Sequence, residues 1–407
     1  MALKHRPTTS RIDQSIWAIF IIFLRLGLTS FGGPIAHLSY FRAEFVVRRG
    51  WLSERSYADL VALCQFLPGP ASSQVGIALG LTRGGYAGAL AAWLGFTLPS
   101  VVALILFALG MAQYGHLIAF EVLGGLKIVA VAVVAQAVWG MGQKLCTDGF
   151  RVTIMVIAAC WVLLVATIWA QLSAILVAGI VGWLRISSPA MSIPEQLSVS
   201  INRRASVSCL GLFFTLLLGL PILSQLVFEQ AWLNQSLAMV DGFYRAGALV
   251  FGGGHVVLPL LQAEVVPPGW VDNNVFLAGY GAAQAVPGPL FSFAAFLGAS
   301  FTTAPNGWLG ALLALVAIYA PAFLLVVGAL PYWERLRASS HMQAALAGIN
   351  AAVVGLLLAA LYDPVWTSAI YRPQDFALAL LALIALVFWK LPPWLVVIGG
   401  GLAAWLW

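Results

Sequence analysis

Two identical Pro-Gly-Pro segments, at residues 68–70 and 287–289, interrupt long apolar stretches of this chain. Proline removes a backbone donor and glycine tolerates dihedral angles closed to other residues, so each segment predicts a broken helix. Hydrocarbon cannot satisfy the backbone groups that a break sets free, and such breaks persist in membranes where protein encloses them or they line a cavity. In transporters they often build the substrate site. The two segments therefore predict two discontinuous helices that contribute to one site.

The composition predicts a membrane protein. Of 407 residues, 62% are hydrophobic and 8% are charged, whereas soluble domains average about 25% charged residues. Apolar runs long enough to cross a bilayer recur from Ile16 to the end of the sequence. These features predict an all-α polytopic protein surrounded by the lipid bilayer. The net charge of +6 lies mostly in loops, which suits anionic headgroups better than nucleic acid.

The two halves of the chain are copies of each other. At an offset of 220 positions Arg25 matches Arg245 and Glu44 matches Glu264, and at 219 Gln65 matches Gln284. Chance similarity between apolar helices would not align these polar residues. We predict an N-terminal repeat over 1–190, a linker with an additional helix over 191–230, and a C-terminal repeat over 231–407.

The repeats also predict a topology. Six apolar segments in each repeat and the unmatched helix between them give about 13 transmembrane segments. An odd helix between two six-segment repeats inverts the second repeat relative to the first. The Lys and Arg residues of the loops favour a cytoplasmic N-terminus, with four exceptions, which are Arg42, Arg48, Arg49 and Arg372. We interpret the first apolar run as a retained span rather than a cleaved signal peptide.

The half-helices that restart after each break are candidate anion sites. Pro70 and Pro289 suit the first helical position, and the free N–H groups of a helix N-terminus attract anions. The alternative is a kink that only shapes packing. The predicted anion-binding residues are Arg25, Gln65, Gly69, Ser72, Ser73, Lys127, Arg245, Gln284, Gly288 and Ser292. The predicted helix-break residues are Gly32, Gly33, Pro68, Pro70, Gly252, Gly253, Pro287 and Pro289.

Three cationic residues, Arg25, Lys127 and Arg245, lie inside predicted apolar segments, where a charge is energetically unfavourable. An arginine near mid-span costs about 2.5 to 3.5 kcal/mol on insertion scales. We expect Arg25 and Arg245 to converge on one central site, because a guanidinium fork matches two oxygens of a tetrahedral oxyanion. Snorkelling of each arginine to the membrane surface is the alternative. Lys127, which aligns with Asn350, either belongs to the site or pairs with Glu121.

Carboxylates are the candidate carriers of a coupling ion. Uphill transport needs energy and this sequence has no Walker-type phosphate loop, so a proton on a carboxylate with a shifted pKa is expected. The candidates are Glu44 and Glu264, which are matched between repeats, together with Asp59 and Asp241, which are not. For the glutamates, a salt bridge to an arginine at the membrane face is an equal alternative.

The motifs resemble a known family. Phe31-Gly32-Gly33-Pro34, then Glu44, Trp51-Leu52 and Gln65-x-x-Pro68-Gly69-Pro70, with their second copy, resemble the bacterial chromate ion transporter (CHR) family over essentially the whole chain. The resemblance implies a long, two-domain exporter of chromate in the inner membrane, driven by the proton motive force and conferring chromate resistance. It also implies two halves of opposite topology and leaves sulfate-like oxyanions as further substrates.

Other functions stay open at this point. A proton-coupled exporter of another anion, or of a metal cation held by carboxylates and the freed carbonyls at Gln65 to Leu67, is the alternative within transport. No H-E-x-x-H or G-x-S-x-G motif occurs, so we expect no enzyme activity. We likewise expect no resident metal and no cofactor, since the cysteines show no ligand spacing. A homodimer is an open alternative to a monomer.

Overall fold

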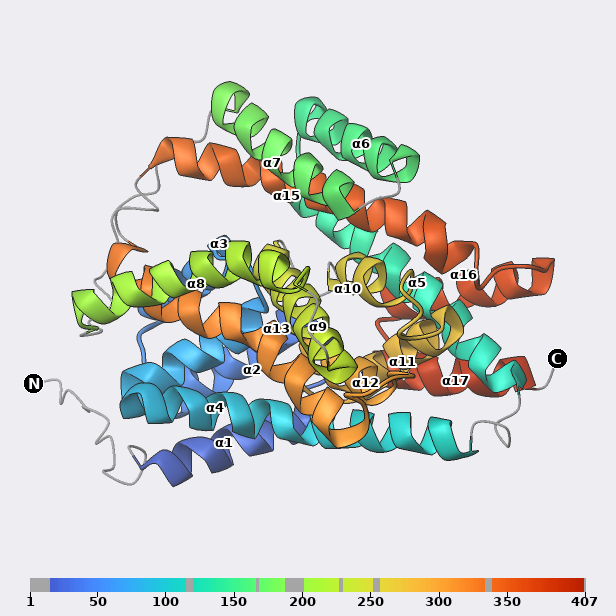
Figure 1. Cartoon of the computed structure of the whole chain (residues 1–407), viewed down its shortest axis with the longest axis horizontal. Coiled ribbons are helices and arrows are strands. Elements are labelled where there is room, and N and C mark those ends of the chain that lie inside the picture. The colour runs from blue at the N-terminus through green and yellow to red at the C-terminus, as the bar shows by residue number, and fades with distance from the viewer. Residues whose placement is uncertain are drawn as a thin grey trace, which may run out of the picture.

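A computed structural model describes residues 15–114, 120–165, 168–186, 201–226, 230–251, 257–333 and 339–405. Helices account for all of the regular structure in these residues (Figure 1). Gly252 and Gly253 of the second Phe-Gly-Gly motif, and residues 191–200 and 227–229 of the predicted linker, lie outside the described residues. The expectation of an all-α chain is confirmed for the described part.

The helices follow the predicted segments. The first half contains α1 (Ile16–Thr29), α2 (Gly33–Phe41), the π-helical η2 (Arg42–Arg48), α3 (Glu54–Phe66), α4 (Ala71–Tyr114), α5 (Phe120–Leu145), α6 (Gly149–Leu164) and α7 (Ile168–Arg185). The unmatched helix is α8 (Arg203–Leu223). The second half contains α9 (Ala231–Leu249), α10 (Val257–Val265), α11 (Asn273–Ala285), η5 (Leu290–Ser292), α12 (Phe293–Ala299), α13 (Gly307–Ala329), η6 (Leu330–Tyr332), α15 (Ser340–Ala360), η7 (Leu361–Trp366), α16 (Pro373–Val387) and α17 (Pro393–Trp405).

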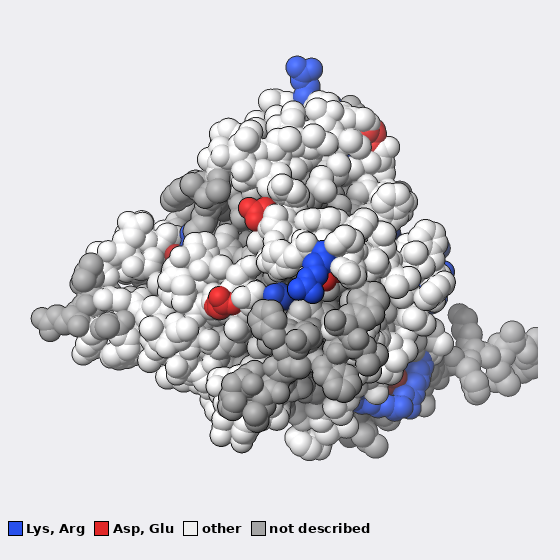
Figure 2. Space-filling view, turned by 90° about the vertical axis from the view of Figure 1, so that its right-hand side faces the viewer, with Lys and Arg blue, Asp and Glu red and all other residues white. Residues whose placement is uncertain are grey.

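Among the described residues, five helices are long and apolar enough to cross a membrane. They are Ala71–Tyr114, Gly124–Leu145, Arg203–Leu223, Gly307–Tyr332 and Ser340–Trp366. Several apolar helices of 10 to 17 residues accompany them. Figure 2 shows Lys, Arg, Asp and Glu side chains as separate small groups on a face that is otherwise made of uncharged residues. The chain is thus a membrane protein, while the number of 13 crossings stays a prediction.

Both predicted breaks are confirmed. α3 begins after Ser53, whose hydroxyl accepts the Ser56 N–H, and it ends at Phe66 before the first Pro-Gly-Pro. α4 begins directly after Pro70. In the second half the helix restarts after Pro289 as the 3₁₀ turn η5, followed by α12. The interruption of a helix by proline, glycine and proline is therefore the same in both halves, although the restart differs.

Corresponding helices pack in the same way in both halves. α1 packs on α4, and α9 packs on α13. A Cβ atom on Gly27 of α1 would lie 2.6 Å from the Phe96 oxygen, and one on the matching Gly247 of α9 would lie still closer to the Ile318 oxygen. Gly27 and Gly247 differ by 220 positions, and Phe96 and Ile318 by 222. The duplication seen in the sequence thus extends to its tightest helix contacts.

The remaining helices are exchanged between halves. α5 of the first half packs on α16 and α17 of the second, whereas α15 of the second half packs on α6 and α7 of the first. Figure 1 shows α6, α7 and α15 together at the top of the molecule. α8 covers α9 and α13. Because each half completes the packing of the other, the two repeats form one interlocked body.

The close helix contacts make a stability prediction. Gly27→Ala and Gly247→Ala force a methyl group against a backbone oxygen, and overpacking of this kind costs about 1 to 3 kcal/mol. We expect both variants to unfold at lower temperature in detergent. Gly140→Ala is the control, because a Cβ there meets no atom of the described residues within 4 Å. Equal midpoints for all three variants would contradict the packing account.

Candidate functional site

Each helix break is bonded to the opposite half of the chain. The Gly69 N–H donates to the Val250 oxygen at 2.7 Å, and the Gly288 N–H donates to the Ser30 oxygen at 3.0 Å. Ser30 and Val250 are matched residues that directly follow α1 and α9. The two bonds are therefore equivalent and reciprocal. Each Pro-Gly-Pro is fixed at the point where the first helix of the other repeat ends.

The two glycines also fit their surroundings in the same way. Gly69 has φ of +124° and Gly288 has φ of +109°, conformations that other residues rarely adopt. A Cβ on Gly69 would lie 3.8 Å from that of Ala322, and a Cβ on Gly288 would lie 3.1 Å from that of Ser100. Ala322 and Ser100 are matched residues that follow a proline inside α13 and α4. Each break thus lies against the proline-containing helix of the opposite half.

The first turn of α4 places three polar side chains in the protein interior. Ser72, Ser73 and Gln74 are all buried. The Gln74 amide donates to the Pro68 oxygen at 2.7 Å, which holds the break in shape. The Ser72 oxygen lies 3.4 Å from Nδ1 of His37. This turn is the restarted helix N-terminus at which the sequence predicted an anion site.

His37 is a site residue that the sequence analysis missed. It stands on α2, a helix too short to cross a bilayer, with 1% of its surface exposed, and its ring meets Phe96 edge-on at 5.2 Å. Burial lowers the pKa of His37 to about 4, although a hydrogen bond with the Ser30 backbone opposes that effect. The imidazole is therefore neutral at pH 7. The apolar spacing around it gave no sign that α2 turns this residue inward.

Buried polar atoms gather around the first turn of α4. The hydroxyls of Ser73 and Thr97 face that of Tyr319 from α13, yet none of the three completes a hydrogen bond with a described residue. Ser30 Oγ and His37 Nε2 are also buried and make no hydrogen bond to a described residue. A buried polar group without a partner costs about 1 to 3 kcal/mol. We name these five residues the hydroxyl cluster, and its open donors can bind a small polar ligand.

The polar groups of the second break are directed inward. The Ser292 hydroxyl donates to the Pro289 oxygen of its own break. Gln284 is half-buried, and its amide nitrogen makes no hydrogen bond to a described residue, while its counterpart Gln65 is exposed on α3. The two breaks therefore share a backbone design but differ in side chains. Among the described residues, the first break alone has several buried hydroxyls around it that make no hydrogen bond.

The structure does not bring the two matched arginines together. Arg25 is exposed on α1. Arg245 on α9 is mostly buried and forms ion pairs with Asp241 at 3.1 Å and Glu264 at 2.8 Å. Arg25 thus lies outside the hydroxyl cluster, and Arg245 is engaged with two carboxylates. Anion binding by these two residues stays a prediction from the sequence.

Lys127 ties the two halves together. It is buried on α5 and donates to the Asn274 side-chain oxygen at 3.0 Å, in the first turn of α11. The side chain of Glu121, its alternative partner, lies outside the described residues. The contact with α11 gives Lys127 a structural role, and its part in anion binding stays a prediction.

The two matched glutamates have different environments. Glu44 lies on η2 beside Arg48 and Arg49, at 3.1 and 2.7 Å. Burial raises the pKa of Glu44, but the hydrogen bonds from both arginines outweigh burial and hold it below its usual value. For Glu264 on the nine-residue α10, burial outweighs the nearby Arg245 and raises the pKa to about 7. Asp59, the remaining candidate, is half-buried on α3.

A separate cavity of about 640 Å³ lies between α6, α7, α10, α11 and α15. Its polar lining is made of Gln171, Gln262, Asn273 and Asp363. Its described lining includes no lysine or arginine and does include a carboxylate. The hydroxyl cluster therefore provides more suitable groups for binding a dianion than this cavity does.

Discontinuous helices that enclose polar groups inside an apolar bundle are features of membrane transporters. The chain belongs to the chromate transporter family, since the family model matches residues 17–183 and again 237–405. The resemblance seen in the motifs and the prediction of two homologous repeats are both confirmed by these matches.

Relatives in other organisms match over nearly the whole chain. A chromate transport protein of Pseudomonas aeruginosa is 28% identical, covering 95% of this chain and 91% of that protein. A chromate transport protein of Cupriavidus metallidurans is 26% identical, covering 98% and 94%. A probable chromate transport protein of Synechococcus elongatus is 28% identical, covering 91% and 88%. No solved structure matches the chain.

The environment of Glu264 predicts a pH dependence of stability. Because its pKa rises from 4.5 to about 7 on folding, the folded chain holds this proton more tightly than the unfolded chain. The resulting stabilisation is complete below pH 4.5 and is lost as the pH rises through 7. His37, whose pKa is lowered by burial, contributes in the opposite direction between pH 4 and 6.5. We therefore expect the unfolding midpoint of the wild type in detergent to fall relative to that of Glu264→Gln as the pH rises from 4.5 to 7. Glu44→Gln should keep the wild-type slope. Parallel pH profiles for the wild type and Glu264→Gln would contradict the assignment.

Proposed function

We propose that this chain is a secondary active transporter that exports chromate, and with it sulfate-like oxyanions, across the bacterial inner membrane in exchange for protons. Membership of the chromate transporter family and the two relatives named chromate transport proteins support the substrate. The observation that carries the proposal is the hydroxyl cluster, a group of buried open donors where the first break restarts as α4.

The cluster suits a tetrahedral dianion. The first N–H groups of α4 have no acceptor within the helix, and their partial positive charge favours an anion. Ser73, Thr97 and Tyr319 offer three hydroxyl donors to the same place. An oxyanion with four oxygens can accept from several of these groups at once. Neutral donors bind a dianion without holding it as firmly as paired guanidiniums would, which suits a transporter that must release it.

The breaks favour an anion over a metal cation. A cation would need the carbonyl oxygens that a helix break sets free. The oxygens of Ser30, Val250 and Pro68 already accept hydrogen bonds from Gly288, Gly69 and Gln74. The groups left open in the described cluster are hydroxyls and an imidazole. A metal-cation exporter is therefore the less supported alternative.

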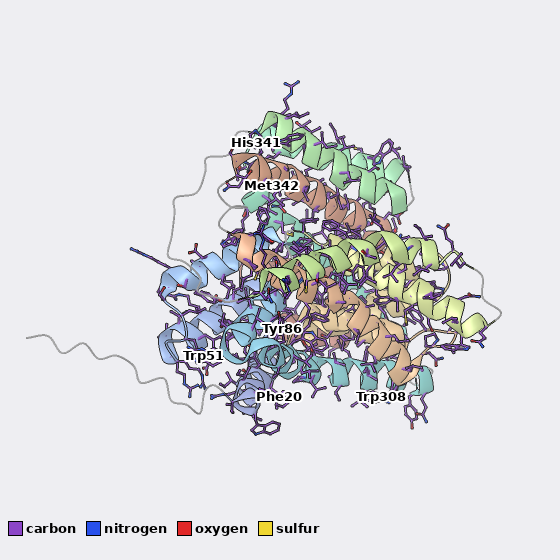
Figure 3. The ribbon with its side chains drawn as sticks, turned by 60° about the vertical axis from the view of Figure 1, so that its left-hand side comes forward. Phe20, Trp51, Tyr86, Trp308, His341 and Met342 are labelled. Atoms are coloured by element: carbon purple, nitrogen blue, oxygen red, sulfur yellow. The ribbon has the colours of Figure 1, made fainter. Side chains whose placement is uncertain are left out.

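We further propose that the two repeats have opposite orientations in the membrane and that the N-terminus is cytoplasmic. α4 is kinked at Gly84 and Gly85. Figure 1 supports the inversion, because the part of α4 after this kink and its counterpart α13 run in opposite directions. The matched aromatic residues Tyr86 and Trp308 begin these two spans, and Figure 3 labels both at the surface. Exposed aromatic residues at the start of a span are typical anchors at a membrane interface. Inversion would place these two anchors at opposite faces.

Flux measurements in everted membrane vesicles test the function. We expect chromate to enter energised vesicles that contain the protein, with competition by sulfate and weaker competition by molybdate. A protonophore should abolish the accumulation. Vesicles from cells without the protein are the control. Accumulation that is unchanged by the protonophore would contradict proton coupling. Absence of chromate transport would contradict chromate as the substrate.

Single hydroxyl deletions test the site. Tyr319→Phe and Ser73→Ala each remove one donor, and a hydrogen bond to a charged group contributes about 1.5 to 3 kcal/mol. We expect chromate affinity to fall roughly 10- to 100-fold in each variant. Tyr86→Phe is the matched control, since it removes the same hydroxyl at an exposed position. Unchanged chromate affinity in both cluster variants would remove the hydroxyl cluster as the anion site.

A further inference from the structure

A buried ionic cluster lies where α8, α9 and α10 meet, apart from the hydroxyl cluster. Nη2 of Arg245 contacts Asp241 at 3.1 Å and Glu264 at 2.8 Å. The Ser224 hydroxyl, at the end of α8, donates to Asp241 at 3.4 Å. The exposed fractions of the Asp241, Arg245 and Glu264 side chains are 7%, 16% and 11%. We name these three residues the acid cluster.

The acid cluster holds one carboxylate more than its cation can neutralise. Both carboxylates contact the same guanidinium nitrogen, and the other Asp241 oxygen and Nε of Arg245 make no hydrogen bond to a described residue. Two ionised carboxylates beside one guanidinium leave a net negative charge in a poorly solvated place. A single proton removes that charge, because it leaves one ionised carboxylate for one guanidinium.

Other elements around the cluster do not supply the missing cation within the described residues. α13 carries no charged residue, and α15 carries only His341, in its first turn. On α11, Asp272 is coupled to Lys127 of α5 and adds no positive charge to α10. The proton is therefore the species that can balance this cluster.

The matched region of the first repeat is built differently. Ile21 replaces Asp241 at the offset of 220, and Arg25 is exposed. Glu44 has two arginines on its own segment, so that cations outnumber the carboxylate. In the second repeat Pro267-Pro268-Gly269 replaces Arg48-Arg49-Gly50. The duplicated glutamate has thus kept its place, but only the second copy faces a deficit of positive charge.

We propose that the acid cluster is the proton-carrying site of the transporter, with the proton on Glu264, and that the first repeat carries no coupling proton. This inference rests on the proposed function as a proton-coupled transporter. The burial of Glu264 supports it, since it raises the pKa into the neutral range where a carboxyl can load and release a proton.

The position of the cluster connects it to the anion site. α9 carries Asp241 and Arg245, and it ends one residue before Val250, the acceptor for the Gly69 N–H. Nine residues of helix, about 13 Å, separate Asp241 from this contact. Proton loss strengthens the attraction between α9 and α10, and proton gain weakens it. A shift of α9 moves the residue that fixes the first Pro-Gly-Pro, and with it the first turn of α4.

Two transport assays on reconstituted protein test the proposal. Chromate counterflow without a pH gradient measures binding and exchange, while accumulation under an imposed pH gradient measures coupling. We expect Glu264→Gln to keep counterflow and to lose gradient-driven accumulation, whereas Glu44→Gln keeps both. Glu264→Asp, which retains a carboxyl, should recover part of the accumulation. Full accumulation by Glu264→Gln, or an equal loss in Glu44→Gln, overturns the proposal.

An infrared pH titration separates this inference from the proposed function. The C=O band of a protonated carboxyl should disappear through neutral pH in the wild type and in Glu44→Gln, and should be missing in Glu264→Gln. If the wild type shows no chromate counterflow but keeps this band, the proposed substrate fails and the proton site stands. If Glu264→Gln retains the neutral-pH band, the proton site is overturned whatever the protein transports.

Discussion

The structure depends on two reciprocal hydrogen bonds, from Gly69 to Val250 and from Gly288 to Ser30. A broken helix in an apolar bundle must satisfy the backbone groups that it frees. Here each break satisfies a glycine N–H with the end of a helix in the other repeat. Neither repeat can complete its own break. The same dependence recurs in the exchange of α5 and α15 between halves, which explains why the repeats form one body.

The two repeats share a backbone design and have diverged in chemistry. The first break presents Ser72 and Ser73 beside His37, and the second repeat has Val257 where the first has His37. The second repeat instead holds Asp241 next to Arg245, where the first has Ile21. The duplicated fold thus contains equivalent positions in both repeats that carry different residues. We assign those of the first repeat to anion binding and those of the second to proton binding. The bond from Gly69 to Val250, the residue after α9, connects the helix of the proton-binding positions to the first break.

Much of the fold could be predicted from the sequence because its causes are local. Proline and glycine stop a helix wherever they occur, so the ends of α3 and α11 follow from residues 68–70 and 287–289. The duplication follows from matched polar residues such as Gln65 and Gln284. The exchanged packing of α5 and α15 could not be predicted, because it depends on contacts between segments far apart in the chain. The thirteen crossings and the inversion were predicted from parity and loop charge, and both stay predictions.

The candidate site was predicted less well, for a physical reason. Offsets show that Arg25 and Arg245 correspond, but not which way each side chain points. Asp241, one turn before Arg245, draws that guanidinium inward, whereas Ile21 offers Arg25 no such partner. His37 and Tyr319 were missed because each sits in an apolar run whose spacing gives no direction. The restarted N-terminus of α4 was predicted, since a helix start after Pro70 places Ser72 and Ser73 in its first turn whatever surrounds it.

The central claim is that the anion binds where the first break restarts as α4, against α13 of the other repeat. Anomalous X-ray scattering from chromium in crystals of the protein with chromate tests it most directly. The predicted result is one strong peak within hydrogen-bonding distance of Ser73 and Tyr319, beside His37. A peak between α6 and α7, or at the exposed arginines Arg25 and Arg48, with none at the hydroxyl cluster, would contradict the claim.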